Sequence, residues 1–242
     1  MIVNNTNFEV LYETDNFIVV NKPAPLLVHP SVPGNPPTLL DGVKDLLAYD
    51  IANGAKLSII NRLDRETSGV VIVAKNKPTA RQFGIAMQEH KITKEYLAVV
   101  HGTPEEKKFT VEAPILRAGE VEESKIWVKQ IIHPNGKSSI TRFELIEKLN
   151  DFSLLKAIPE TGRMHQIRVH SLHVNLPIVG DKIYGLNENL YLEFIKTGWT
   201  KELESELIMP RQALHCHRMS LEGVGEWEAP MPNSFKTCGA AP

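Results

Sequence analysis

The feature that most constrains this fold is a charged stretch between two apolar runs. Residues 61–69 read NRLDRETSG and lie between the runs LSII and VVIVAK. Short apolar runs on either side of a turn-forming sequence predict two strands joined by a loop. Ionised groups beside a core are costly unless they are paired, and those that persist there often take part in chemistry. The sequence therefore predicts a strand, a charged loop and a second strand.

Within this loop, an extended Arg62-Leu63-Asp64 would direct Leu63 into the core and the other two side chains to the opposite side. Two arginines, Arg62 and Arg65, lie within two residues of Asp64, so they favour its ionised form and predict a low pKa. From these residues alone two interpretations remain open. Asp64 is either a carboxylate kept charged for chemistry or part of a surface ion pair that caps a strand.

Length and composition limit the other possibilities. A chain of 242 residues, 42% of them hydrophobic, can bury a sizeable core. The N-terminus lacks a signal-peptide pattern, and no apolar run is long enough to span a membrane. The two cysteines, Cys216 and Cys238, form no CxxC pair, which suits a reducing cytoplasm and argues against a disulfide framework or a cysteine-rich zinc site. Because the net charge is −2, a polyanion would need a local basic patch.

Strand-like and helix-like segments are mixed along the chain without strict alternation. Strands are expected at 8–13, 16–23, 57–61, 70–75, 95–102, 109–114, 124–132, 138–149, 152–160, 213–222 and 225–232. Helices are expected at 38–49, 78–90, 164–174, 189–197 and 200–208. The first helix should bury one side: Leu39, Val43, Leu46 and Leu47. No linker divides the chain, so we predict one α/β or α+β domain around a mixed sheet.

Two further stretches combine basic residues with recognisable elements. ETGRMHQIRVH, residues 160–170, leads from a glycine-containing turn into a helix, and a helix N-terminus near Arg163 predicts an anion site. Helical spacing puts His165 and Arg168 on one face, with Arg168 pointing outward from an otherwise packed helix. RQALHCHRM, residues 211–219, gathers basic side chains around a strand: Arg211, His215, His217 and Arg218. A surface salt bridge at Arg168 and a capped strand end at 211–219 are the alternatives.

Five ordered blocks resemble the RluA-type family of RNA pseudouridine synthases: FIVVNKPAPLLVHP, RLDRETSGVVIVAK, KEYLAVVHG, TGRMHQIRVHSLHVNLPIVGDKIYG and RQALHCHRMSL. The resemblance covers roughly residues 8–232. It implies the pseudouridine synthase fold as one catalytic domain, residues 1–242, with a long bent mixed, mostly antiparallel sheet, flanking helices and a central active-site cleft. The S4-like N-terminal domain of longer members is expected to be absent.

The resemblance also implies roles for individual residues. Asp64 falls on the catalytic aspartate, which attacks the target nucleotide at the ribose C1′ or at C6 of the uracil. Tyr96 falls on the active-site tyrosine, which stacks on the uracil and assists removal of the C5 proton; a tyrosine packed in the core is its alternative. Arg168 falls on the basic residue paired with the aspartate. Arg62 is similar to the arginine that fills the space left in the RNA by the flipped base.

The implied substrate is RNA, in tRNA, large-subunit rRNA or both, and the reaction requires no metal, nucleotide or redox cofactor. Further RNA contacts are expected from Arg163, His165, Arg211, Lys91 and Lys94, for which a solvated basic surface is the alternative. We expect a monomer in the cytoplasm that does not contact a membrane.

Three positions depart from the family pattern. Asn61 stands where many members have His, and because Asn cannot titrate near neutrality we assign it no proton-transfer role. Pro25 replaces a frequent glycine, which puts the shape of that loop in question, and Cys216 occupies a position often held by Ala.

Two other functions compete with the isomerase. A metal hydrolase could use His165, His170 and His173, although in a helix only the last two share a face. An RNA-binding protein without catalysis is the other, and the retained aspartate, tyrosine and arginine argue against it. Loss of turnover without loss of binding in Asp64→Asn would separate these functions.

Overall fold

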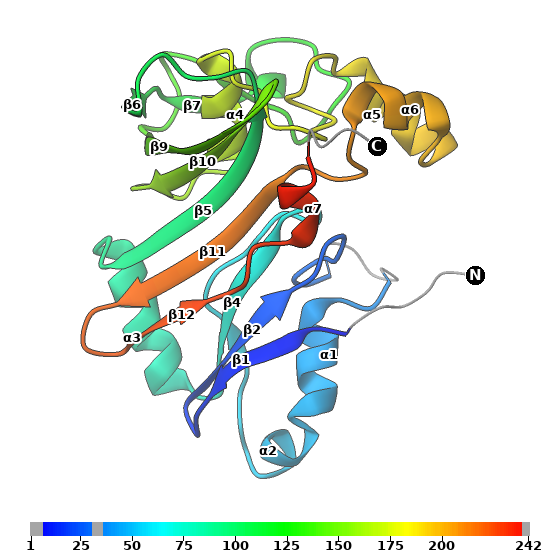
Figure 1. Ribbon diagram of the computed structural model, residues 1–242. Helices are drawn as coiled ribbons and strands as arrows, with labels where there is room; N and C mark the ends of the chain where they lie inside the picture. The colour runs from blue at the N-terminus through cyan, green and yellow to red at the C-terminus, as the bar shows by residue number, and fades with distance from the viewer. Residues whose placement is uncertain (1–6, 31–35, 239–242) are drawn as a thin grey trace. The chain divides into compact units, whose positions relative to one another are not determined.

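The computed structural model describes residues 7–30 and 36–238, which form two compact units (Figure 1). Of these residues, unit 1 contains those up to Lys94 together with Cys216–Pro230. Unit 2 contains Glu95–His215 and the residues from Met231 onward. The boundary falls inside two strands, β5 (Ile92–His101) and β11 (Leu214–Leu221). The assignment of residues 1–242 to one domain stays a prediction.

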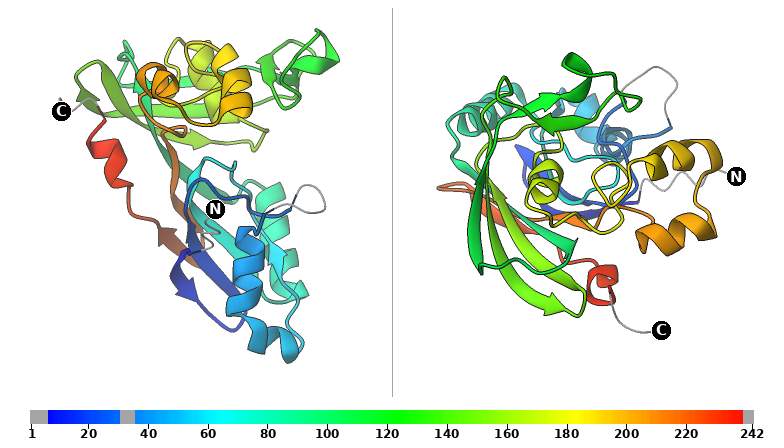
Figure 2. Two further views of the ribbon diagram at one scale, coloured as in Figure 1. Left: turned by 90° about the vertical axis from the view of Figure 1, so that its right-hand side faces the viewer. Right: turned by 90° about the horizontal axis from the view of Figure 1, so that it is seen from above.

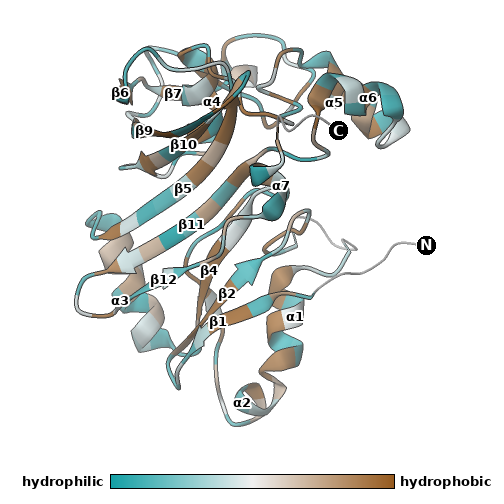
Figure 3. Cartoon of the chain, viewed as in Figure 1, coloured by the Kyte–Doolittle hydropathy of each residue, from teal (hydrophilic) through white to brown (hydrophobic). Residues whose placement is uncertain are grey.

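Unit 1 is built on antiparallel strand pairs. Strand β2 pairs with β1 and β4, strand β3 pairs with β4, and β12 pairs with β11. Their bounds are β1 (Glu9–Glu13), β2 (Phe17–Lys22), β3 (Ser58–Ile59), β4 (Ser68–Ala74) and β12 (Gly225–Glu228). All seven residues of β4 are buried, and its apolar part is brown in Figure 3. The strand–loop–strand prediction for the charged stretch is therefore confirmed.

Three helices belong to unit 1 within its described residues: α1 (Leu39–Leu46), α2 (Ala48–Ala52) and α3 (Lys77–Gln88). The single helix expected over 38–49 is wrong, because the backbone of Leu47 leaves the helical conformation and separates α1 from α2. Leu39, Val43 and Leu47 are buried as expected, but Leu46 is 52% exposed.

Helix α3 follows its prediction closely. The Asn76 side chain accepts a hydrogen bond from the backbone N–H of Thr79 at 2.9 Å, which caps the helix N-terminus. Pro78 lies in the first turn, where a missing N–H removes no helical bond.

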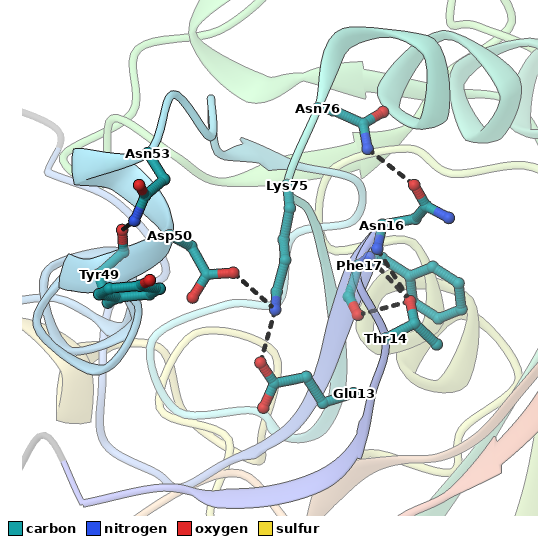
Figure 4. Close-up of polar contacts among 9 residues, drawn as sticks. All are labelled: Glu13, Thr14, Asn16, Phe17, Tyr49, Asp50, Asn53, Lys75 and Asn76. Carbon is teal, nitrogen blue, oxygen red and sulfur yellow. Dashed lines mark hydrogen bonds and ion pairs between the residues drawn. The ribbon is translucent and has the colours of Figure 1, made fainter.

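A buried lysine fixes the end of β4. The Nζ atom of Lys75 lies 2.5 Å from a Glu13 carboxylate oxygen and 3.4 Å from one of Asp50 (Figure 4). Burial lowers the pKa of Lys75, but its hydrogen bonds and charge interactions with the two carboxylates outweigh this and raise the pKa above its usual value. The ion pairs therefore tie β4 to β1 and α2 inside unit 1.

Unit 2 contains a second run of antiparallel strands, in the order β5–β10–β9–β6. Their bounds are β6 (Lys108–Glu112), β9 (Ile140–Leu149) and β10 (Phe152–Pro159). A separate two-stranded sheet pairs β7 (Ile115–Arg117) with β8 (Gln130–Ile132). Val99, Leu155 and Phe143 lie in the buried core of this unit. A turn lies at Pro134-Asn135-Gly136, where the N–H of Gly136 bonds to the carbonyl of His133 at 2.8 Å.

The α-helices of unit 2 in the described part are α4 (Gln166–His173), α5 (Asn189–Thr197), α6 (Lys201–Leu207) and α7 (Asn233–Lys236), with one 3₁₀ turn at Ala118–Glu120. Helices α5 and α6 lie side by side (Figure 2) around a small core of Leu190, Leu203 and Leu207. None of the helices in the described residues is long and apolar enough to cross a membrane.

Most strand and helix predictions are confirmed, and the α+β class with them. The strand expected over 124–132 is wrong except for Gln130–Ile132. Its apolar centre does not pack as a strand, because Trp127 is largely exposed and lies under the guanidinium group of Arg117 at 4.2 Å. The sequence also gave no sign of β7 or α7. The bend of the sheet and the central cleft stay predictions.

Candidate active site

The charged loop contains a tight turn from Asp64 to Thr67. The N–H of Thr67 donates to the carbonyl of Asp64 at 3.1 Å. Arg62 is exposed, Leu63 is buried and Asp64 is half-buried. The predicted orientation of Leu63 into the core is confirmed. Within this turn Asp64 is therefore only partly shielded from solvent.

Asn61 joins this loop to the neighbouring strand. Its side-chain amide donates to the carbonyl of Val70 at 3.0 Å and accepts from the N–H of Ile72 at 2.9 Å. The backbone N–H of Ile60 bonds to the carbonyl of Ile72, so the Asn61 side chain extends the ladder after β3 has ended. These bonds give Asn61 a structural role.

A buried lysine holds the turn from the other side. Lys22 is fully buried, and its Nζ donates to the carbonyls of Leu26 at 2.7 Å, Pro23 at 3.0 Å and Arg65 at 3.3 Å. The Arg65 carbonyl also accepts from the N–H of Leu26 at 2.8 Å. Lys22 therefore ties the loop after β2, which contains a cis Ala24–Pro25 bond, to the Asp64 turn. Lys22 was not among the predicted site residues; its signal in the sequence was a lysine at the end of an apolar strand.

Gly69 allows the turn to enter β4 against β11. Its φ is +115°, and a Cβ atom at this position would collide with the backbone carbonyl of Cys216. Only glycine can adopt this φ readily and also leave room for the carbonyl of Cys216. Because the close approach involves the backbone at 216, the side chain of Cys216 does not disturb it.

The two lysines expected to contact RNA in unit 1 have different surroundings. Lys91 is exposed and forms an ion pair with Glu89 at 2.7 Å; the hydrogen bond and charge of Glu89 raise its pKa. Lys94 is half-buried, and burial lowers its pKa. A phosphate beside Lys94 would favour its charged form. Both RNA contacts stay predictions.

Tyr96 is a strand residue of unit 2. It lies in β5 opposite Ala157 of β10 and packs against the core cluster, yet its side chain is only half-buried. Core packing is thus one part of its role, and the stacking role stays a prediction.

Arg168, on α4, has a buried ionic partner in the same unit. It is 5% exposed, and its Nε and Nη2 donate to the two carboxylate oxygens of Asp181 at 2.6 and 2.9 Å. The prediction that Arg168 points outward is wrong, and so is the alternative of a surface salt bridge. A buried cation is tolerated here because a buried carboxylate compensates it in a bidentate arrangement.

Asp181 is itself held by the backbone. Its Oδ1 accepts the N–H groups of Ile183 at 3.0 Å and Tyr184 at 2.9 Å. Burial would raise the pKa of Asp181, but the charge and hydrogen bonds of Arg168 and these two N–H groups together bring it below its usual value. Asp181 was not among the predicted site residues, although it follows a glycine that ends an apolar run.

Tyr184 connects this ion pair to His165. The guanidinium carbon of Arg168 lies 4.9 Å from the centre of the Tyr184 ring. The Tyr184 hydroxyl accepts the N–H of Gln130 at 2.8 Å and lies 2.8 Å from Nδ1 of His165. His165 has a left-handed backbone with φ of +55°, which is uncommon for a residue other than glycine. The structure thus brings His165 and Arg168 together around one tyrosine.

The side chain of Gln166 forms hydrogen bonds within the turn that precedes α4. The Gln166 Oε1 accepts from the N–H of Arg163 at 3.0 Å and from the hydroxyl of Thr161 at 2.7 Å. The exposed Arg163 donates from Nε to the carbonyl of Ser138 at 3.1 Å. The anion site expected here stays a prediction, as does the RNA contact of Arg163.

Arg211 has local partners at a strand end. Its Nη1 donates to the carbonyls of Gln212 at 3.1 Å and Leu214 at 3.4 Å, and its guanidinium lies 5.2 Å from the Phe235 ring. These contacts favour the capped strand end, while a phosphate contact at Arg211 stays a prediction.

The histidines of α4 do not support the metal hydrolase. His170 is fully buried, with Nδ1 at 2.9 Å from the Thr141 hydroxyl and Nε2 at 2.9 Å from the Ala113 carbonyl. His173 is exposed, so the face expected to be shared by these two histidines is divided between core and surface. In the described ranges, no group of three His, Cys, Asp or Glu side chains could hold a metal ion.

Known structures define the class of fold. Human RNA Pseudouridylate Synthase Domain Containing 4 matches with a TM-score of 0.73 at 24% identity, over 94% of this chain and 90% of that one. Human RNA Pseudouridylate Synthase Domain Containing 1 matches with a TM-score of 0.71 at 25% identity, over 97% and 86%. The fold is therefore that of a pseudouridine synthase, as predicted.

Sequence comparison gives the family. Residues 16–173 match the family profile described as RNA pseudouridylate synthase. Ribosomal large subunit pseudouridine synthase D of Haemophilus influenzae is 34% identical over 96% of this chain and 69% of its own length. Ribosomal large subunit pseudouridine synthase C of Buchnera aphidicola is 39% identical over 81% of this chain and 58% of its own length. The chain belongs to the RNA pseudouridylate synthase family, which confirms the resemblance to its RluA-type members. It is an isomerase that acts on RNA.

Proposed function

We propose that the protein isomerises specific uridines of large-subunit rRNA to pseudouridine, with Asp64 as the nucleophile. The observation that carries this proposal is the turn at Asp64, a half-buried residue whose neighbouring backbone is held by hydrogen bonds of the Asn61 and Lys22 side chains. The relatives named as ribosomal large subunit pseudouridine synthases support the choice of RNA. Uridines in tRNA are the alternative target.

The isomerisation conserves every atom of the uridine. The bond between N1 and the ribose C1′ breaks, the base turns, and a bond forms between C5 and C1′. The proton on C5 leaves and N1 gains a proton, so the formula is unchanged. Asp64 would attack either C1′ or C6 and be released when the new bond is complete. Such a nucleophile must be ionised, and the neighbouring Arg62 and Arg65 favour that form.

A fixed turn is suited to this step. Reacting atoms must be held close to their productive geometry, and a displacement of about 1 Å can cost about a hundredfold in rate. The Asp64 turn meets this need through backbone contacts, with Asn61 on one side and Lys22 on the other. The carboxylate itself can then meet a nucleotide that comes from solvent.

The other site residues would serve the flipped nucleotide. The target base has to leave its stack before a carboxylate can reach it. Arg62 is exposed beside Asp64 and would fill the vacated space in the RNA. Tyr96 would stack on the uracil and assist removal of the C5 proton. Arg168 would balance the charge of Asp64 during the reaction of this nucleotide.

A complementation experiment tests the proposal. Pseudouridines are mapped in large-subunit rRNA and tRNA from cells that lack this gene and carry wild type, Asp64→Asn or Asp45→Asn. Asp45 is an exposed carboxylate of α1, so its substitution is the matched control. We expect wild type and the control to restore pseudouridine at the same rRNA positions and Asp64→Asn to restore none. Restoration by Asp64→Asn would refute the nucleophile, and restoration in tRNA alone would refute the rRNA target.

We further propose that one chain suffices for the reaction and that it takes place in the cytoplasm. Sedimentation of the purified protein at assay concentration should give the mass of a monomer, 27.1 kDa. A dimer with one active site would contradict this.

A further inference from the structure

Three contacts within unit 2 fix the guanidinium group of Arg168. Two are the hydrogen bonds from Nε and Nη2 to Asp181, and the third is the face of the Tyr184 ring. A guanidinium group is planar, so two bonds along one edge and a ring against one face define its orientation.

The contacts also define which edge Arg168 presents. Because Nε and Nη2 form the edge that faces Asp181, the edge formed by Nη1 and the second hydrogen of Nη2 points away from that carboxylate. Asp181 cannot turn with the arginine, because its Oδ1 is held by the N–H groups of Ile183 and Tyr184. The backbone of residues 181–184 is therefore the fixed point of the arrangement.

We infer that Asp181 is a positioning residue, which sets the direction of the outer guanidinium edge of Arg168 and thereby the rate of the chemical step. The inference rests on the proposed function, in which that edge balances the charge of Asp64. Tyr184 serves the same arrangement, since its ring lies against Arg168 and its hydroxyl holds His165.

Stability alone is a weak reason for this ion pair. Burying two charges costs about as much as their attraction returns, and apolar pairs of similar size often stabilise a protein at least as well. A bidentate pair does, however, fix direction, which an apolar pair cannot do. The expected signature of Asp181 is therefore a change in rate at constant RNA affinity.

Two substitutions of Asp181 distinguish the effect of the Arg168 orientation from the effect of the negative charge beside it. Asp181→Glu keeps the negative charge beside Arg168 but moves the carboxylate by one methylene, so the original bidentate geometry is lost. Asp181→Asn keeps the shape and removes the charge. Glu13→Gln is the control, because it weakens the ion pair of another buried cation, Lys75, in unit 1. Far-ultraviolet circular dichroism shows which variants are folded.

The readout is the single-turnover rate constant of pseudouridine formation at saturating enzyme, with RNA affinity measured separately. Because enzyme is in excess over RNA, a partial loss of folded enzyme leaves this rate constant unchanged as long as the folded fraction still saturates the RNA. We expect Asp181→Glu and Asp181→Asn to lower the rate constant at least about tenfold, with RNA affinity within about twofold of wild type. Glu13→Gln should keep the wild-type rate constant.

The outcomes distinguish this inference from the proposed function. A wild-type rate constant in Asp181→Glu overturns the inference, and so does a loss confined to RNA affinity. If Asp181→Asn does not fold, Asp181→Glu decides alone, because it keeps the charge. If wild-type enzyme forms no pseudouridine, or if Asp64→Asn forms it normally, the proposed function fails instead.

Discussion

The Asp64 turn of unit 1 and the Arg168 centre of unit 2 differ in the contacts that surround them. Asp64 is half-buried, and the structure holds its backbone: Lys22 and Asn61 form hydrogen bonds with the main chain around it. Arg168 is buried, and the structure holds its side chain through the carboxylate of Asp181. If Asp64 is the nucleophile and Arg168 the cation that balances its charge, as we propose, the first must meet a substrate from solvent and the second needs a fixed direction. The contacts in the two regions suit these two proposed tasks.

The largest expected difference concerns stability. Arg168→Ala leaves Asp181 as a buried, uncompensated carboxylate, which should cost about 3–5 kcal/mol of unfolding free energy. Asp64→Asn removes a half-buried charge whose surrounding backbone bonds remain, so we expect a change under about 1 kcal/mol. Urea unfolding of both variants measures the two values. Equal losses would remove the contrast between the regions.

Arg168→Ala also tests the role of the cation in turnover. In the fraction that remains folded, we expect the single-turnover rate to fall more than RNA affinity does, if the proposed role of the arginine, to balance the charge of Asp64, is correct. Filter binding beside single-turnover assays measures both. A loss in binding alone would assign Arg168 to RNA recognition.

The next effect concerns the backbone support of the turn. Lys22→Met removes a buried ammonium group and leaves the carbonyls of Pro23, Leu26 and Arg65 without this donor. We expect a loss of about 2 kcal/mol and at least about tenfold slower turnover, with unchanged RNA affinity. Hydrogen exchange at the Thr67 amide, which closes the turn, should accelerate in this variant. Wild-type exchange at Thr67 would show that Lys22 does not hold the turn.

A smaller effect comes from acidification and arises in unit 2. Burial lowers the pKa of His170, so the folded protein keeps this imidazole neutral at pH values where the unfolded chain protonates it. Below about pH 6.5 the unfolded state binds more protons, and stability falls by at most about 1.4 kcal/mol per pH unit from this group. His170→Asn should flatten the dependence of unfolding free energy on pH between about 7.5 and 5.5. An unchanged slope would exclude His170 as its source.

The smallest expected effect is on the salt dependence of RNA binding, and it distinguishes Arg163 from Arg211. Binding should weaken as salt rises, because phosphate contacts release counterions, with about 0.7–0.9 units of log–log slope per contact. If Arg163 and Arg211 each bind a phosphate, replacing either by Gln lowers the slope by about one contact. Arg163 is exposed, whereas Arg211 bonds to strand-end carbonyls, so an unchanged slope for Arg211 alone would establish the capping interpretation. An affinity insensitive to salt in the wild type would contradict a basic RNA-binding surface.

Local signals in the sequence predicted most elements correctly. Helix α3 was predicted from a segment with Pro78 in its first turn, and β4 from an unbroken apolar run. The errors arose where packing in the folded protein, and not the local sequence pattern, determined the structure. Leu47 breaks the first helix although its apolar spacing continues, and Trp127 is exposed although its neighbours read as a strand.

The site residues were predictable only in part, because their partners are distant in the chain. Arg168 looked like an outward cation, since its carboxylate, Asp181, lies thirteen residues away on another segment. Lys22 and the Arg65 carbonyl are 43 residues apart. Ordered motifs gave Asp64, Tyr96 and Arg168 as proposed site residues, and their roles stay predictions; motif spacing carries no information on which groups hold them.

The assignment of Asp64 as the nucleophile is tested most directly by measuring product formation by Asp64→Asn on RNA that is already bound. The variant and wild type are each saturated with the same uridine-containing rRNA fragment, and pseudouridine is measured by mass spectrometry over one turnover. We expect equal binding, full conversion by wild type and none by the variant. Conversion by Asp64→Asn at the wild-type rate would contradict the assignment.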